Sequence, residues 1–119
     1  MDWKLDDSRP IWPQLSQQLA RRIIAGVYPP GSRLPPVREL AAEAGVNPNT
    51  MQRALAQLEQ EGLARADRTA GRLVTRDAAV LDAARLREAR AVVRGYLEDM
   101  SALGYGREDA ARLLKEEFQ

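Results

Sequence analysis

The sequence predicts a mostly helical protein with one small β-hairpin. Three observations carry this prediction. Apolar residues recur at helical spacing in several segments, glycine or proline marks the ends of those segments, and two short extended segments flank a loop that contains glycine. The 119 residues are enough for a single hydrophobic core. Hydrophobic residues make up 45% of the chain and charged residues 29%, which is typical of a globular protein.

The first helix is expected to run from about Ile11 to Ala25, after an N-terminal arm of residues 1–9. Pro13 falls in its first turn, where a missing N–H group does no harm, and Gly26 marks its end. One face of this helix carries an apolar residue at every fourth position, namely Ile11, Leu15, Leu19 and Ile23.

Two further helices are expected at residues 37–44 and 48–61, joined by a tight turn at Gly45. Ala41 stands four residues before this glycine, and Met51 stands six residues after it. A small residue lets the second helix cross the first closely, and an apolar residue at the later position anchors the second helix. This spacing is typical of a helix-turn-helix.

Two extended segments, residues 63–66 and 72–75, are expected to pair as a hairpin directly after these helices. Residues 33–34 form a further short extended segment. Three helices followed by a hairpin within residues 1–76 is the order of a winged helix-turn-helix, in which the hairpin is called the wing.

Residues 77–119 are expected to form a tail of two helices, the first over residues 79–103 and the second beginning near Arg107. Apolar residues of the long helix alternate at spacings of three and four, the heptad pattern of helices that pair. This seam can pack on the chain's own first domain or on a second copy. A homodimer is favoured, because two such helices make too small a core alone. The expected dimer contacts are Leu86, Val93, Tyr96, Met100 and Leu103, and Ala89 completes the seam.

The composition excludes several classes of site. The chain contains neither cysteine nor histidine, which removes disulfides, thiolate nucleophiles, the usual general base and the commonest metal ligands. We therefore expect no enzyme activity, no cofactor and no metal site. No apolar run approaches the ~20 residues of a membrane span, and the acidic N-terminus lacks the apolar core of a signal peptide. A soluble cytoplasmic protein is expected.

Positive charge is concentrated in the middle of the chain, although the net charge is only +1. Residues 8–76 carry ten basic and five acidic residues, and sixteen of the eighteen basic residues are arginine. The planar guanidinium suits forked contacts with phosphate or guanine. Such a distribution permits nucleic-acid binding, although a charged helix face is more often simply solvated.

Three segments carry a family resemblance: LPPVRELA, GVNPNT and LEQEGL, followed by AGRLVT in the wing. Residues 10–76 resemble the DNA-binding domain of GntR-type bacterial transcription regulators. The short tail, with GYGRED before its last helix, is similar to the compact YtrA-like subfamily. The resemblance implies a homodimer that binds a palindromic operator, commonly as a repressor. It also implies two C-terminal helices for dimerisation in place of a large ligand-binding domain.

The residues that contact double-stranded DNA follow partly from helix geometry and partly from the resemblance. With Met51 directed into the core, Asn49 and Arg53 point away from it, with Thr50 and Gln52 beside them. The first turns of helix 48–61 are therefore expected to enter the major groove, where such side chains read base edges. The resemblance adds Arg38, and the wing adds arginines suited to phosphate or a minor groove. The expected DNA-binding residues are Arg38, Asn47, Asn49, Thr50, Gln52, Arg53, Arg68, Gly71 and Arg72.

Alternatives stay open for some of these residues. Asn47 is also the expected N-cap of helix 48–61, and Arg38 can instead pair with a neighbouring glutamate or stand in solvent. Many members of the family carry arginine at the positions of Pro48 and Gln52, so an operator sequence does not transfer. The chain can also be a winged helix that serves as a protein–protein interaction module, although the polar face of helix 48–61 favours DNA. A small-molecule effector is possible, but no sequence feature marks its pocket.

Overall fold

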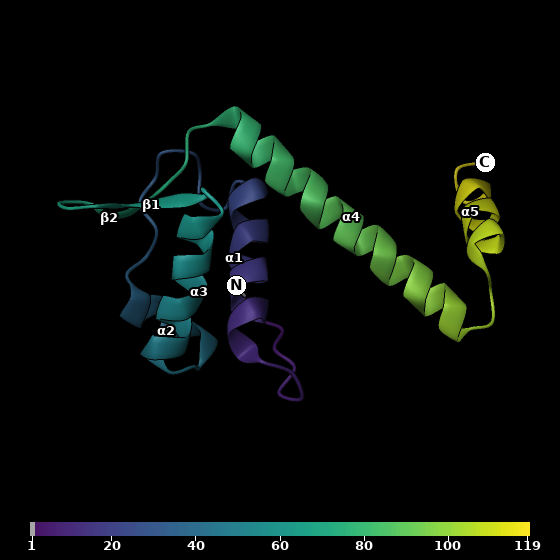
Figure 1. The fold of residues 1–119 in the computed structure, drawn as a ribbon, viewed down its shortest axis with the longest axis horizontal. Coiled ribbons are helices and arrows are strands. Elements are labelled where there is room, and N and C mark those ends of the chain that lie inside the picture. The colour runs from purple at the N-terminus through teal and green to yellow at the C-terminus, as the bar shows by residue number, and fades with distance from the viewer. Residues whose placement is uncertain (1) are drawn as a thin grey trace. The chain divides into compact units, whose positions relative to one another are not determined.

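The computed structural model describes residues 2–119 as a mostly helical chain with one two-stranded antiparallel sheet (Figure 1). This confirms the predicted fold class, and the boundaries lie within one or two residues of those expected. The elements in chain order are α1 (Ile11–Ile24), α2 (Val37–Ala44), α3 (Pro48–Gln60), β1 (Ala64–Asp67), β2 (Gly71–Val74), α4 (Ala78–Ala102) and α5 (Arg107–Glu116).

The chain divides into two compact units, one reaching to Arg85 and the other spanning Leu86–Gln119. The domain boundary expected after residue 76 comes earlier in the sequence than this division. The reason is that the first turns of α4 belong to the first unit, where Val80 and Leu81 pack against the core and Ala84 is buried in it.

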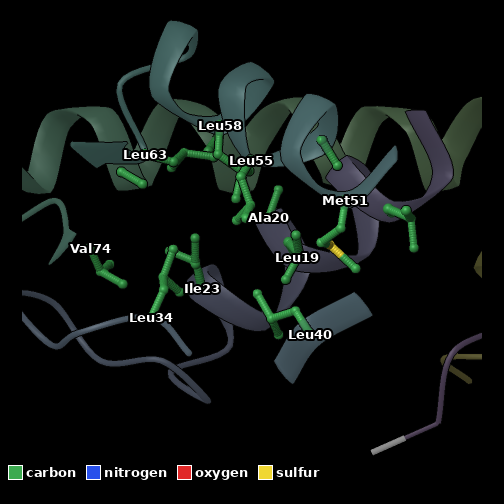
Figure 2. Packing of buried hydrophobic residues seen from close by; sticks show 14 of the residues in the cluster. Leu19, Ala20, Ile23, Leu34, Leu40, Met51, Leu55, Leu58, Leu63 and Val74 are labelled. Carbon is green, nitrogen blue, oxygen red and sulfur yellow. The ribbon is translucent and has the colours of Figure 1, made fainter. Parts of the chain in front are cut away.

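Helices α1, α2 and α3 enclose the core of the first unit. Both α1 and α2 pack on α3, and Met51, which was expected to face the core, is fully buried together with Leu55 and Leu58 (Figure 2). Apolar residues at every fourth position of α1 supply the opposite side, since they fall on one helical face. The largest side chains sealed in this core are Leu15, Leu19, Leu40, Met51, Leu55, Leu58, Leu63 and Val74.

The wing consists of β1, β2 and the loop of residues 68–70, and it projects from the helices of its unit (Figure 1). The strands pair with Ala64 opposite Val74. Arg33 forms an isolated bridge with Leu73, as the expected short strand at residues 33–34 requires. In the loop, backbone N–H groups of Ala70 and Thr69 donate to Asp67 and hold the pKa of its carboxyl below the ordinary value.

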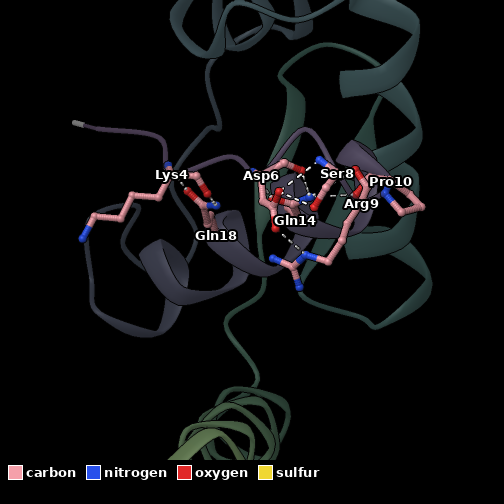
Figure 3. A network of polar contacts seen from close by, with 7 residues as sticks. All are labelled: Lys4, Asp6, Ser8, Arg9, Pro10, Gln14 and Gln18. Carbon is pink, nitrogen blue, oxygen red and sulfur yellow. Dashed lines mark hydrogen bonds and ion pairs between the residues drawn. The ribbon is translucent and has the colours of Figure 1, made fainter. Parts of the chain in front are cut away.

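The N-terminal arm is held on α1 by side-chain amides (Figure 3). Gln18 accepts a hydrogen bond from the Lys4 N–H at 3.0 Å and donates to the Lys4 carbonyl at 2.7 Å, as a neighbouring strand would. Gln14 likewise accepts a hydrogen bond from the Asp6 N–H at 2.7 Å and donates to the Asp6 carbonyl at 2.9 Å. Residues 4–6 of the arm are therefore held on α1 without being part of a helix or sheet.

Gly45 ends α2 in the left-handed region, with φ of 71°. An added Cβ would meet no atom within 4 Å, so Gly45→Ala changes the backbone energy alone. We expect this variant to lower the free energy of unfolding by about 1 kcal/mol, measured by urea denaturation. Gly95→Ala is the matched control, because Gly95 lies inside α4 without a positive φ and with equally open space. That change is expected to stabilise its helix by about 1 kcal/mol, and a loss at Gly95 would contradict the backbone argument.

Candidate DNA-binding surface

The N-terminus of α3 is capped as the sequence predicts. The Asn47 side chain accepts a hydrogen bond from the Asn49 N–H at 2.7 Å, and Pro48 occupies the first helical position. The cap orders the first turn of the helix that is expected to meet DNA. It leaves Asn47 exposed, so capping is compatible with a phosphate contact, which stays a prediction.

The face of α3 opposite Met51 is polar and open. Asn49, Gln52 and Arg53 are exposed and Thr50 is half-buried, while Met51 is sealed in the core. Within residues 2–119, the side chains of Asn49 and Gln52 make no hydrogen bond, so their amide donors and acceptors are free for another partner. Paired donor and acceptor groups of this kind match the edge of adenine in the major groove.

Arg38 is exposed at the second position of α2. No ion pair or hydrogen bond in the described part of the chain involves its guanidinium, and nearby Glu43 binds Arg22 at 3.1 Å. Its N–H donors are therefore available to a phosphate without first breaking an ion pair. Its role in DNA binding stays a prediction.

The wing arginines differ from each other. Arg68 is exposed in the loop and has no ion-pair partner among the residues described. Arg72 is half-buried and its Nε donates to the carboxylate of Glu59 on α3. Gly71 begins β2 with φ of 80°. A contact between Arg72 and DNA therefore has to compete with Glu59, whereas Arg68 is free for one.

The second unit leaves much of the heptad seam uncovered. Leu86 and Val93 are 54% and 55% exposed and Leu103 is 73% exposed, whereas Tyr96 and Met100 are half-buried. The Tyr96 hydroxyl donates to the carbonyl of Ala110 on α5 at 2.7 Å, which accounts for part of its burial. Large apolar side chains at this exposure are typical of an interaction surface.

The described part of the chain offers neither a metal-binding cluster nor a membrane-spanning helix. Residues 2–119 hold no group of three or more acidic side chains suited to a metal ion. No helix within the same range combines the length and the apolar character that a membrane crossing requires.

Residues 13–74, about half of the chain, match the family described as bacterial regulatory proteins, gntR family. The chain belongs to the GntR family. This confirms the resemblance carried by the three sequence segments. GntR-family members are transcriptional regulators with a DNA-binding domain, and this regulator is accordingly not an enzyme.

Relatives of similar length extend the comparison beyond the DNA-binding domain. The GntR-family regulator is 32% identical to the uncharacterized HTH-type transcriptional regulator YhcF of Bacillus subtilis, over 97% of this chain and 95% of that protein. It is 39% identical over 71 residues to the HTH-type transcriptional repressor YtrA of the same species, over 60% and 55% of the two chains. A solved GntR family transcriptional regulator from Listeria monocytogenes superposes with a TM-score of 0.80 and 33% identity, over 94% of this chain and 98% of that one.

Sequence reasoning missed Arg22 in this GntR-family regulator. The pair Arg21-Arg22 near the end of α1 looks like solvated charge, yet Arg22 is only 6% exposed. Its Nη1 donates to the Tyr28 hydroxyl at 3.0 Å and to the Glu43 carboxylate at 3.1 Å. Its guanidinium carbon lies 4.0 Å from the centre of the Trp3 ring. Arg22 thus ties α1, α2 and the arm together. The only sequence signal was its place three residues after Leu19, on the apolar side of the helix.

Substitutions of Asn47 separate capping from DNA contact. Asn47→Ala removes the bond to the Asn49 N–H, so the free energy of unfolding is expected to fall by about 1 kcal/mol in urea denaturation. Asn47→Asp keeps a capping oxygen and is expected to restore that stability. If Asn47 lies beside a phosphate, the same variant places a negative charge there, so its DNA affinity is expected to fall below that of Asn47→Ala. Unchanged DNA affinity in Asn47→Asp would place Asn47 away from the phosphates.

Proposed function

We propose that this GntR-family regulator represses transcription by binding, as a homodimer, to a palindromic operator. The observation that carries the proposal is the face of α3 formed by Asn49, Gln52 and Arg53, which is exposed and polar on a helix whose other side is sealed in the core. A protein-binding helix of this size would present a more apolar face.

In this proposal α3 enters the major groove with its N-terminal turns against the base edges. Asn49 and Gln52 read bases, and Thr50 and Asn47 reach phosphates. Arg53 contacts the DNA from the same face as Asn49. Arg38 neutralises a phosphate from the start of α2. Arg68 reaches the DNA from the wing, next to Gly71 at the start of β2. Arg72 reaches it only by leaving Glu59.

Dimerisation is proposed through the seam residues of α4. The exposure of Leu86, Val93 and Leu103 in one chain supports it, because apolar side chains at heptad spacing are stabilised when a second helix covers them. Tyr96 and Met100 continue the same seam. A two-fold dimer of this kind addresses half-sites about one helical turn, ~34 Å, apart. The repressor assignment draws support from the similarity to YtrA, which is named a transcriptional repressor.

The site of action follows from this activity. A regulator that binds operator DNA works in the bacterial cytoplasm, associated with the nucleoid while it is bound. The proposal requires no metal and no cofactor for DNA binding.

The test is a titration of the protein against the DNA upstream of its own gene and against a shuffled control, each at two salt concentrations. Tighter binding to the native fragment, with both affinities falling steeply as salt rises, is the expected result. Failure to bind either fragment at low salt would overturn the proposal and favour a protein-interaction module.

Arg38→Ala sharpens this test. Loss of one phosphate contact is expected to lower the affinity for both fragments roughly tenfold. The slope of log affinity against log salt concentration is expected to fall by about one. Arg112→Ala is the matched control, since it removes one positive charge from α5, where Arg112 only pairs with Asp109 and Glu116. Equal affinities for the two variants would remove Arg38 from the proposed interface.

A further inference from the structure

Arg53 does not stand alone on the exposed face of α3. Its guanidinium carbon lies 4.6 Å from the centre of the Trp12 ring, and Trp12 comes from the first turn of α1, which packs on α3. Arg53 remains exposed and Trp12 is half-buried. The ring is thus partly covered by the fold at the start of α1, while the Arg53 side chain that lies over it is exposed to solvent.

Stacking occupies only the flat face of a guanidinium. Its five N–H donors lie in the plane of the group and point outward from its edge. Within residues 2–119, no hydrogen bond or ion pair uses these donors of Arg53. Arg53 thus lies against a ring and keeps its N–H edge free, so that its guanidinium can donate hydrogen bonds to two oxygen or nitrogen acceptors in one plane.

The second arginine–tryptophan stack of the chain provides a contrast. Arg22 lies 4.0 Å from the centre of the Trp3 ring, but it is 6% exposed and its Nη1 is bound to Tyr28 and Glu43. That stack has a structural role, because it joins elements of the fold. The stack on Trp12 leaves its cation exposed, so its edge is open to a molecule outside the chain.

We propose that Trp12 is a positioning residue for DNA recognition. It holds the guanidinium of Arg53 so that the N–H edge meets a pair of acceptors on the DNA, either phosphate oxygens or the O6 and N7 atoms of guanine. Binding then orders a side chain whose freedom is already restricted, which strengthens the contact. The inference rests on the proposed function, because it assigns Trp12 to the same DNA-binding face.

The test is a double-mutant cycle on operator affinity with Trp12→Leu, Arg53→Ala and the double variant. Each single change is expected to lower affinity roughly three- to thirtyfold, and the double variant is expected to bind no more weakly than Arg53→Ala. Trp12→Phe keeps an aromatic face and is expected to recover most of the affinity. A loss from Trp12→Leu that is as large in the Arg53→Ala background as in the unchanged protein would overturn the inference, and so would full affinity in Trp12→Leu.

Trp3→Leu is the matched control. It disrupts the other stack and is expected to lower the melting temperature, while any effect on operator affinity adds to that of Arg53→Ala. If the unchanged protein binds no DNA, the proposed function and this inference fail together. If it binds its operator and the cycle is additive, this inference alone fails.

Two further readouts identify the acceptors. If Arg53 meets a phosphate, Arg53→Ala is expected to reduce the salt dependence by about one ion and to weaken binding to all sequences alike. If it meets guanine, the salt dependence stays the same and the loss is confined to operators that carry that base pair. If Arg53→Ala produces neither of these two patterns, Arg53 does not touch the DNA. That result would also overturn the inference.

Discussion

Val93→Glu is expected to leave the protein monomeric and to lower operator affinity roughly 100-fold or more. Val93 lies in the middle of the α4 seam and is 55% exposed in a single chain. In a dimer, the new carboxylate would be buried against apolar side chains of the partner, and its lost hydration opposes association. Two half-sites would then be bound by separate monomers, so the gain from linked binding is lost.

Light scattering at micromolar protein and operator titration measure the two effects. The matched control is Ala102→Glu, which introduces the same charge at an exposed position of α4 that is not part of the seam. This control is expected to remain a dimer with nearly unchanged affinity. A dimeric Val93→Glu protein with full affinity would remove the seam from the dimer interface. Unchanged helical circular dichroism in both variants would show that the charge does not act by unfolding the chain.

Leu55→Ala is expected to lower the free energy of unfolding of the first unit by about 2–5 kcal/mol. Leu55 is fully buried on α3, the helix on which both α1 and α2 pack. Removal of its branched end leaves a cavity that neighbouring helices fill only in part. Because α3 also presents the DNA-binding face, weaker operator binding is expected as the variant approaches its unfolding temperature.

Urea denaturation followed by circular dichroism measures this loss. Gln60→Ala serves as the control on the same helix, because Gln60 is exposed at its last turn, and a change within about 0.5 kcal/mol is expected. A loss below about 1 kcal/mol in Leu55→Ala would mean that the core around α3 closes over the missing atoms.

The helices and the wing were predictable because local patterns determine them. Leucine and isoleucine at every fourth position of α1 place one face inward whatever the remainder of the chain does. Gly45 marks the end of α2, and the Asn47-Pro48 pair marks the start of α3, because single residues have strong preferences for these positions. The exposed and buried faces of α3 follow from the position of Met51 in the same way.

Pairs between distant residues were not predictable from such patterns. Arg72 meets Glu59 across thirteen positions, and Trp12 meets Arg53 across a longer stretch of chain. Each pair depends on how whole elements pack. Many other charged residues of the chain have similar neighbours in the sequence, so the sequence does not single out these pairs. The extent of the first unit has the same origin, since Ala84 joins the core only because α4 begins against it.

The two stacks give the protein a built-in optical signal. Trp3 and Trp12 are the two tryptophans of the chain, so its indole emission arises at the arm and beside α3. The emission of an indole responds to a cation resting on its ring and to the water around it. Trp3→Phe would leave Trp12 as a single reporter next to the proposed DNA-binding face. Operator binding could then be followed by steady-state fluorescence in unlabelled protein, with Arg53→Ala identifying the part of the signal that the stack contributes.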